Sequence, residues 1–418
     1  MKNKKLIGFV GLSHLSLSYS LASAKRGYQI VMYDFNSNLM NKFKNYHIDF
    51  NEKSLLQKFK SYRNFYDLKN NIKNLNKCRL IFISLDVKTD RNNKADYSKI
   101  KKYINLLNKK LNKKIPFIIQ SQLYPGFCNN LKLGSRDIYY QVETLIFGKA
   151  FYRAYKPDRI IVGYKNSKKF NNFYFKYLSS FKCPIIKMNY YSAELSKIAI
   201  NIFLSSSLTV ANTFARISEI IGSNYKDIEL ALRSDNRIGL NSYLSAGLGI
   251  SGGNLERDLY LIKKFLNKNN INSDFINSII KNSKVSKNWI IKTFLKIHKK
   301  YKVKKVSLVG LSYKKNNSSL KNSPSVLFLK TTNKLNLKVK IYDDLIDEYN
   351  GKDISDIQNV IKNPDIVIFA RDFVNSNLIV KKFFNKKNKL KFCIDPFNLV
   401  KDKYINNFKT KVFQIGKN

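Results

Sequence analysis

The segment GLGISGGNLERD, residues 247–258, combines a glycine cluster with polar side chains that suit a bound molecule. Four of the 16 glycines of the chain fall in these twelve positions. Glycines let main-chain amides approach a sugar or phosphate closely, and Arg237 just upstream is suited to clamp a phosphate in bidentate fashion. Asn254 lies within the segment, and a carboxamide is a poor nucleophile. We expect a loop that covers a ligand, with Asn254 in a binding role; the alternative is an exposed, flexible loop.

A long helical pattern without glycine or proline runs from about Tyr190 to Gly222. Within it, residues 195–215 contain a single charged residue, Lys197. So few charges predict a buried helix. Its serine, asparagine and threonine content, together with the lysine, argues against a membrane span.

Four polar residues share one stripe of this helix, since they are separated by three, four and eleven residues: Glu194, Lys197, Asn201 and Asn212. A buried lysine needs an acid or an anion beside it. One interpretation pairs Lys197 with Glu194 on its own helix. The other aims Lys197 and Asn201 at a developing oxyanion as preorganised donors. The buried polar stripe favours the second interpretation.

A glycine turn near the start of the chain has the spacing of a dinucleotide-binding motif. Gly11 occupies the first position of the GxGxxG pattern, but the second and third positions are Ser13 and Ser16. Serine at the second position is expected to crowd the pyrophosphate, and serine at the third to loosen helix–strand packing. Asp34, at the end of the next strand, suits a ribose diol and would repel a 2′-phosphate, which favours NAD over NADP. The alternative is an α/β unit that binds no dinucleotide.

The elements that position this turn are a strand at residues 5–10, a helix over about 13–26 and a strand at 28–34. The first 24 residues also imitate a secretory signal peptide. A signal peptide does not explain the second strand or its terminal acid, so the structural interpretation is preferred.

The same pattern recurs near the other end, where residues 304–312 parallel 4–13, and 337–344 parallel the strand that ends at Asp34. Further short apolar strands are predicted at 79–85, 116–122, 159–163, 365–370 and 391–396. The expected fold is α/β, with two Rossmann-like, doubly wound parallel-sheet domains joined by a long central helix and a helical region.

The net charge and the few cysteines and histidines restrict the possible functions. The net charge of +49 would fit a nucleic-acid-binding protein, but the basic residues are spread over the whole chain rather than gathered in a groove. The charge would still attract anionic substrates. The four cysteines and three histidines are scattered, which argues against disulfides and metal sites and indicates a reduced, cytosolic protein.

Several stretches together resemble the UDP-glucose/GDP-mannose dehydrogenase family. The resemblance runs in order from about Lys5 to Asp395, and its most specific pieces are PDRIIVG (157–163), AELSKIAIN (193–201), NRIG (236–239), GLGISGGNLERD and GLSYKKNNSSLKNSP (310–324). It implies an NAD-binding domain over residues 1–188, a central helical dimerisation region over 189–298 and a C-terminal nucleotide-sugar (UDP) domain over 299–418. Such enzymes oxidise a sugar C6 alcohol to a carboxylate with two NAD, as homodimers or larger assemblies.

The resemblance also implies roles for single residues. Glu143 would handle water or a thioester, Lys197 and Asn201 would stabilise the oxyanion, and Asp258 would hold a catalytic water. Cofactor contacts would come from Gly11, Ser13, Leu15, Asp34, Ser84, Gln122 and Lys321. Substrate contacts would come from Glu143, Lys197, Asn201, Arg237, Gly249, Gly253, Tyr313 and Lys314, with Arg237 acting across a dimer interface.

The departures from the family pattern concern the reaction itself. Asn254 stands where the family has its catalytic cysteine, Gln122 replaces a threonine, and Arg257 replaces a lysine. Two acids of the C-terminal motif have become Ser318 and Ser319. Alcohol-to-aldehyde oxidation needs no thiol, but the thioester route does.

Three interpretations follow: an NAD-dependent nucleotide-sugar dehydrogenase with incomplete or altered oxidation, a silent binding or regulatory homologue, and a basic nucleic-acid-binding protein. One substitute for the missing thiol is conceivable. Cys128 follows YPGF at a predicted helix start, where amide dipoles would lower the pKa of the thiol.

Overall fold

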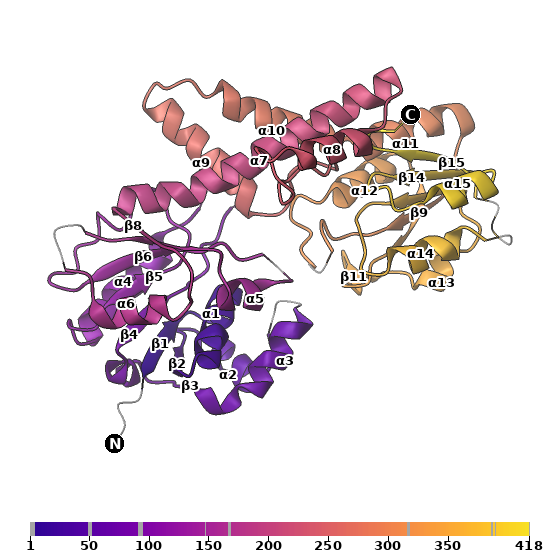
Figure 1. Ribbon diagram of the computed structural model, residues 1–418. Helices are drawn as coiled ribbons and strands as arrows, with labels where there is room; N and C mark the ends of the chain where they lie inside the picture. The colour runs from indigo at the N-terminus through magenta and orange to yellow at the C-terminus, as the bar shows by residue number, and fades with distance from the viewer. Residues whose placement is uncertain are drawn as a thin grey trace. The chain divides into compact units, whose positions relative to one another are not determined.

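The structure is a computed structural model that describes residues 5–48, 52–90, 95–146, 148–165, 169–315, 318–385, 388 and 390–417. The chain forms two compact units, residues 1–200 and 201–418 (Figure 1). Their boundary lies inside one helix, α7 (Tyr190–Ile221). The division into three domains at residues 188 and 298 remains a prediction.

The first unit is built on an eight-stranded sheet with the order β3-β2-β1-β4-β5-β6-β7-β8, in which only the β6–β7 pair is antiparallel. Its strands are β1 (Leu6–Val10), β2 (Gln29–Tyr33), β3 (Tyr66–Leu68), β4 (Leu80–Ile83), β5 (Phe117–Ile119), β6 (Ile138–Val142), β7 (Ile160–Gly163) and β8 (Ile185–Met188). Its α-helices are α1 (His14–Lys25), α2 (Ser37–Lys44), α3 (Lys53–Ser61), α4 (Ser98–Lys110), α5 (Ala150–Tyr155) and α6 (Asn172–Ser179), with short 3-10 turns at Arg63–Phe65 and Ile72–Lys77.

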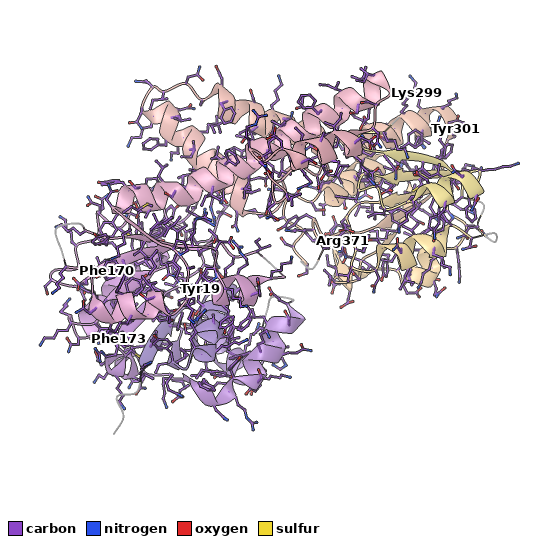
Figure 2. The ribbon with its side chains drawn as sticks, in the orientation of Figure 1. Tyr19, Phe170, Phe173, Lys299, Tyr301 and Arg371 are labelled. Atoms are coloured by element: carbon purple, nitrogen blue, oxygen red, sulfur yellow. The ribbon has the colours of Figure 1, made fainter. Side chains whose placement is uncertain are left out.

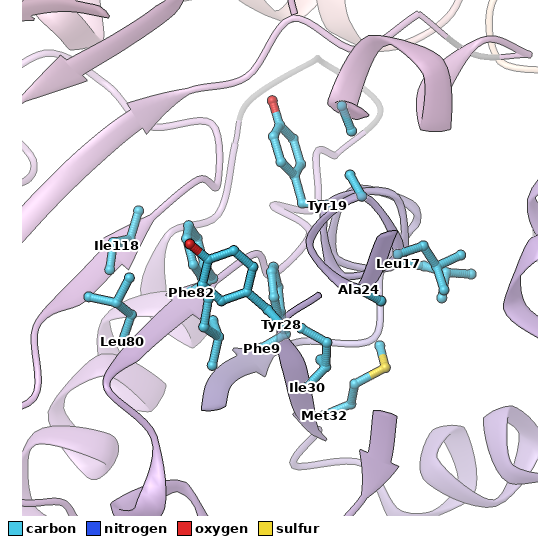
Figure 3. Close-up of a cluster of buried hydrophobic side chains, with 14 of the residues drawn as sticks. Phe9, Leu17, Tyr19, Ala24, Tyr28, Ile30, Met32, Leu80, Phe82 and Ile118 are labelled. Carbon is cyan, nitrogen blue, oxygen red and sulfur yellow. The ribbon is translucent and has the colours of Figure 1, made fainter. Parts of the chain in front are cut away.

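Alternate side chains of the central strands enter two separate cores, one on each face of this sheet. Phe9 and Phe82 stack with ring centroids 4.7 Å apart and pack on the side of α1, as Figure 3 shows. Val10 and Ile83 belong to the other core, which includes Ile104 of α4. Strands that are buried on both faces read as continuous apolar runs, which is why the sequence predicted them.

The second unit repeats this plan around a five-stranded parallel sheet with the order β10-β9-β13-β14-β15. The strands are β9 (Lys305–Val309), β10 (Lys338–Tyr342), β13 (Ile366–Phe369), β14 (Phe392–Asp395) and β15 (Lys411–Gln414), beside a two-stranded pair, β11 (Glu348–Tyr349) and β12 (Lys352–Asp353). Around this sheet lie α12 (Pro324–Lys334), α13 (Ile357–Val360), α14 (Ser376–Phe383) and α15 (Asp402–Asn407), and before it α8 (Tyr225–Ser234), α9 (Asn254–Lys268), α10 (Asp274–Lys287) and α11 (Trp289–Tyr301). Two doubly wound units joined by a long helix confirm the predicted fold class.

The end of the chain is attached to the last turn of α7 through one carboxylate. Glu219 accepts hydrogen bonds from the backbone amide of Gly416 at 3.0 Å and from the indole Nε1 of Trp289 at 3.1 Å. The amide of Tyr225 donates to the carbonyl of Gly416 at 2.8 Å. These bonds connect α7, α8, α11 and the C-terminal segment within the second unit.

The prediction that α7 is buried is wrong for one of its faces. Five apolar side chains of this face are between 41 and 71% exposed: Phe203, Val210, Phe214, Ile217 and Ile221. Apolar composition shows that a helix avoids water, but it does not distinguish the core of one chain from a surface that another molecule covers.

Candidate functional site

The glycine turn of the first unit fits the diphosphate and ribose of a dinucleotide. Gly11 has a φ of 96°, and a Cβ there would lie 3.0 Å from the carbonyl oxygen of Ser84. The next helix, α1, begins three residues later, so its first amides face the end of β1. The half-buried carboxylate of Asp34 accepts from the amides of Leu12 and Asn36, each at 2.8 Å. Its remaining lone pairs suit the hydroxyls of a ribose.

The serines of the motif behave differently from the sequence-based expectation. Ser13 does not point its hydroxyl outward, because that group donates to the carbonyl of Ser84 at 2.6 Å and accepts from the amide of Ser16 as the N-cap of α1. Ser16 is fully buried, and in the described part of the chain its hydroxyl oxygen has no hydrogen-bond partner. Ser84 is also fully buried, and its hydroxyl donates to Gln120 at 2.7 Å, behind the turn. Leu15 is half-buried.

Lys197 pairs with Glu143 rather than with Glu194. The ammonium Nζ of Lys197 lies 3.1 Å from Glu143 Oε1 and donates to the Glu143 carbonyl at 2.8 Å. The other carboxylate oxygen of Glu143 accepts from the amide of Leu145 at 3.0 Å. Both side chains are largely buried, at 10 and 16% exposed, so the first unit holds an ion pair with little water around it.

Glu194 instead organises the turn that carries Cys128. Its carboxylate accepts from the amides of Gly126 at 2.5 Å and Cys128 at 2.8 Å. Burial raises the pKa of Glu194 despite these hydrogen bonds. Burial and the charge of Glu194 raise the pKa of the Cys128 thiol well above its usual range. The predicted low-pKa thiol is therefore wrong: no α-helix begins at this described turn, and a neighbouring carboxylate opposes the thiolate.

Asn201 and Asp258 meet in the second unit. Asn201 Nδ2 donates to Asp258 Oδ2 at 2.6 Å, and Arg257 Nε approaches Asp258 Oδ1 at 3.3 Å. All three side chains are buried. On α7, Asn201 follows Lys197 by one turn, as the spacing predicted. Asn254 is exposed and is the first residue of α9, so its amide is accessible to a ligand.

The glycine loop is attached to neighbouring segments of the second unit. The amide of Gly247 donates to Asn212 Oδ1, the fourth residue of the polar stripe, at 2.8 Å. Gly249 has a φ of 75°, and a Cβ there would lie 2.6 Å from the carbonyl oxygen of Ser283. The backbone of this loop therefore lies close to Ser283, while its approach to a sugar or phosphate stays a prediction.

Two residues of a second segment, Tyr313 and Lys321, lie against this loop. A Cβ on Gly252 would lie 2.8 Å from the hydroxyl of Tyr313, and one on Gly253 would lie 3.8 Å from Lys321 Nζ. The amide of Gly252 donates to the carbonyl of Lys321 at 3.1 Å. Lys314 is exposed.

Arg237 is not drawn into this arrangement. Its side chain is 89% exposed and its Nη2 lies 2.6 Å from Asp235 Oδ2. A phosphate contact by Arg237 stays a prediction. In the first unit, Gln122 is half-buried on the segment after β5.

Comparison with known proteins decides the family. Residues 5–177 match the NAD binding domain of the UDP-glucose/GDP-mannose dehydrogenase family, and residues 191–284 match its central domain. The chain belongs to this family. NAD is accordingly its cofactor, as Asp34 predicted, and the geometry at Gly11 and Asp34 fits that cofactor.

The chain is similar to UDP-glucose 6-dehydrogenase from Rickettsia prowazekii (strain Madrid E), with 24% identity over 359 residues, 80% of this chain and 81% of that protein. It is also similar to the putative UDP-glucose 6-dehydrogenase YtcA of Bacillus subtilis (strain 168), with 24% identity over 344 residues and 80% of each chain. Among solved structures, a UDP-glucose dehydrogenase from Pyrobaculum islandicum superposes with a TM-score of 0.84 at 17% identity, covering 99% of this chain and 98% of that one. The UDP-D-ManNAc dehydrogenase of Pyrococcus horikoshii gives 0.82 at 20% identity and 99% of both chains. These structural likenesses support the fold.

Glu52 lies near the cofactor turn and was not among the site residues predicted from the sequence. Glu52 is only 4% exposed and its Oε2 lies 2.7 Å from His14 Nε2. The one sequence signal was an acid that interrupts a strongly basic stretch directly before the apolar pattern of α3.

Proposed function

We propose that the protein oxidises the C6 alcohol of a nucleotide-diphosphate sugar, of the UDP-hexose or UDP-N-acetylhexosamine type, and that oxidation stops at the aldehyde or slows beyond it. The observation that carries the proposal is the buried Glu143–Lys197 pair in the unit that contains the NAD-binding domain. An ammonium group with so little water around it is a strong donor to developing negative charge.

The residues divide the work of the first oxidation. In the first unit, Lys197 donates a hydrogen bond to O6 as its proton leaves to water. In the second unit, Asn201 keeps the proposed role of an oxyanion donor and Asp258 that of an acid that holds water. When bound, NAD would supply the acceptor for the hydride of C6. The balance is one alcohol and one NAD giving one aldehyde, one NADH and one proton.

The second oxidation lacks its nucleophile. We propose that Asn254 occupies the position of the family's thiol, and a carboxamide cannot form a thiohemiacetal. Cys128 does not replace the thiol, because its sulfur is buried and Glu194 opposes its ionisation. Oxidation of the aldehyde hydrate, assisted by Glu143, remains as a slower route.

The test is NADH formation with a panel of UDP- and GDP-sugars, with the aldehyde trapped by hydroxylamine. We expect one NADH for each sugar consumed, a trapped aldehyde, and no covalent sugar adduct by mass spectrometry. Two NADH for each sugar, released at a single rate and without a trapped aldehyde, would contradict the arrest. Sugar binding in calorimetry with no NADH from any substrate would instead identify a silent binding or regulatory homologue.

We also propose that the protein works in the cytoplasm as a homodimer and that α7 supplies the interface. The exposed residues of its apolar face follow one another at intervals of seven, four, three and four, the spacing of a helix seam that packs on another helix (Phe203, Val210, Phe214, Ile217 and Ile221). Light scattering on Phe214→Lys tests this proposal, with Tyr152→Lys, at an exposed aromatic side chain of α5, as the control. The first variant should be monomeric and the second dimeric.

A further inference from the structure

Glu52 joins two parts of the first unit that serve the proposed reaction. Its carboxylate binds His14 of α1 at 2.7 Å, the amide of Gly148 at 3.1 Å and the amide of Ala150 at 3.3 Å. His14 follows the cap of the cofactor turn directly. Gly148 and Ala150 follow Glu143 by five and seven residues in the chain. One buried carboxylate is thus shared by the NAD side and the Glu143 side.

The position of Glu52 in its own helix shows that these partners determine its conformation. Glu52 is the N-cap residue of α3, where a carboxylate normally accepts from amides of the first turn. It makes no such bond. Its side chain instead reaches partners 38, 96 and 98 residues away in the sequence.

The electrostatics support a carboxylate that needs all three donors. Burial alone would raise the pKa of Glu52, but hydrogen bonds from His14, Gly148 and Ala150 outweigh burial and hold it below its ordinary value. A buried charge that loses one donor pulls more strongly on the remaining ones. A movement of His14 therefore changes the hydrogen bonds that Glu52 accepts from the amides of Gly148 and Ala150.

We propose that Glu52 is a positioning residue that couples occupation of the NAD site, through His14, to the placement of Gly148 and Ala150, which follow Glu143 in the chain. This inference rests on the proposed function, because it assigns Glu143 to the reaction. The coupling needs no contact between Glu52 and either ligand. NAD fixes the first turn of α1, the turn fixes the imidazole, and the imidazole aligns the carboxylate that holds Gly148 and Ala150.

Amide exchange at Gly148 and Ala150, measured with and without NAD, tests the coupling directly. In the native protein, saturating NAD should slow exchange at both amides by about five- to a hundredfold, the usual range for coupled sites. In Glu52→Gln, NAD should no longer change their exchange. Because coupling is reciprocal, the affinity of Glu52→Gln for NAD, measured by calorimetry, should also fall, by no more than that factor.

Two further variants separate coupling from mere stability. His14→Phe should abolish the NAD-induced protection, and His14→Gln, whose amide still donates, should restore part of it. Glu219→Gln is the matched control, because Glu219 also accepts from one backbone amide and one ring nitrogen, but in the second unit. It should leave the protection by NAD unchanged.

The outcomes also separate this inference from the proposed function. Turnover of UDP-glucose should fall about tenfold or more in Glu52→Gln with little change in the KM for the sugar, since misplacement near the reacting groups affects kcat. NAD binding to the native protein without protection at Gly148 and Ala150 would overturn the coupling alone. Failure of the native protein to bind NAD would overturn the proposed function and the coupling together.

Discussion

Two glycine turns, one in each unit, begin alike and differ in what lies across from them. Gly11 and Gly310 have φ values of 96° and 99°, and their amides donate to the carbonyls of Tyr33 at 2.9 Å and Tyr342 at 2.8 Å. After each turn an amide is bound by the acid that ends the next strand. Asp34 accepts from Leu12 at 2.8 Å, and Asp343 accepts from Leu311 at 2.7 Å.

The residue across the turn is Leu85 in the first unit and Arg371 in the second. Both follow the aligned end of the neighbouring strand by two positions. Arg371, labelled in Figure 2, is 1% exposed and contacts Asp343 at 3.1 Å and also Asp344. Burial lowers the pKa of Arg371 despite the charge of Asp343. In the described part of the chain, Asp34 pairs with no cation.

The helix that follows also differs. Helix α1 begins three residues after Gly11, whereas α12 begins fourteen residues after Gly310. The first turn therefore offers amides and a carboxylate to a ligand, while the second has used its acid to bind an internal arginine. One supersecondary pattern thus pairs its acid with an arginine in the second unit but not in the described part of the first.

The largest effect is expected from Arg371→Met. Removing one partner leaves the charge of Asp343 buried, which should reduce the free energy of unfolding by about 3–5 kcal/mol. Urea unfolding followed by circular dichroism measures this change. Leu85→Met at the equivalent position should cost less than about 1.5 kcal/mol. Equal losses in the two variants would remove the distinction between the turns.

The next effect is on turnover. Lys197→Ala should lower kcat by about a hundredfold or more, because the donor to the oxyanion is lost. A thermal melt of the same sample shows whether the protein remains folded. Reduced stability with full activity per folded molecule would mean that the pair with Glu143 is structural, like that of Arg371.

Asp34→Ala should weaken NAD binding by about ten- to a hundredfold, since hydrogen bonds to a charged group contribute about 1.5–3 kcal/mol. The preference over NADP should narrow, because the repulsion of a 2′-phosphate is removed. Calorimetric titration with both cofactors measures this. Asp343→Ala is the counterpart in the second unit and should leave NAD affinity unchanged. Equal or tighter NADP binding by the native protein would contradict the role of Asp34.

The smallest effects concern the serine that follows each turn. Ser13→Ala removes the cap of α1 and should cost about 1 kcal/mol of unfolding free energy. Ser312→Ala should cost less, because Asp343 keeps the amides of Leu311 and Ser312 and the guanidinium of Arg371. Thermal melts of the two variants show which one loses more stability. A larger loss of stability in Ser312→Ala than in Ser13→Ala would contradict the comparison.

The sequence revealed the parts of the fold that are encoded locally. A buried strand, a glycine, a helix and a second strand ending in acid are consecutive, so the turns at Gly11 and Gly310 could be predicted. Side-chain partners could not. The sequence offered Glu194, three residues away, as the ion-pair partner of Lys197. The partner in the structure is Glu143, which lies 54 residues earlier in the chain.

Cys128 illustrates the same limit. A proline and a glycine before it resembled a helix start, but the charge that governs its thiol comes from Glu194, 66 residues later. The exposed side of α7 was missed because the sequence of one chain does not show what covers an apolar face. Glu52 was missed because its three partners come from two distant segments.

The attachment of the C-terminal segment also gives the protein an optical label. Trp289 is the single tryptophan of the chain, and residues 1–200 contain none. Its indole shares Glu219 with the amide of Gly416. Tryptophan fluorescence therefore reports on unfolding of the second unit and on release of the C-terminal segment. The first unit contributes no tryptophan fluorescence. Circular dichroism follows unfolding of the backbone in both units. Comparing it with tryptophan fluorescence would distinguish the unfolding of the two units without an added dye.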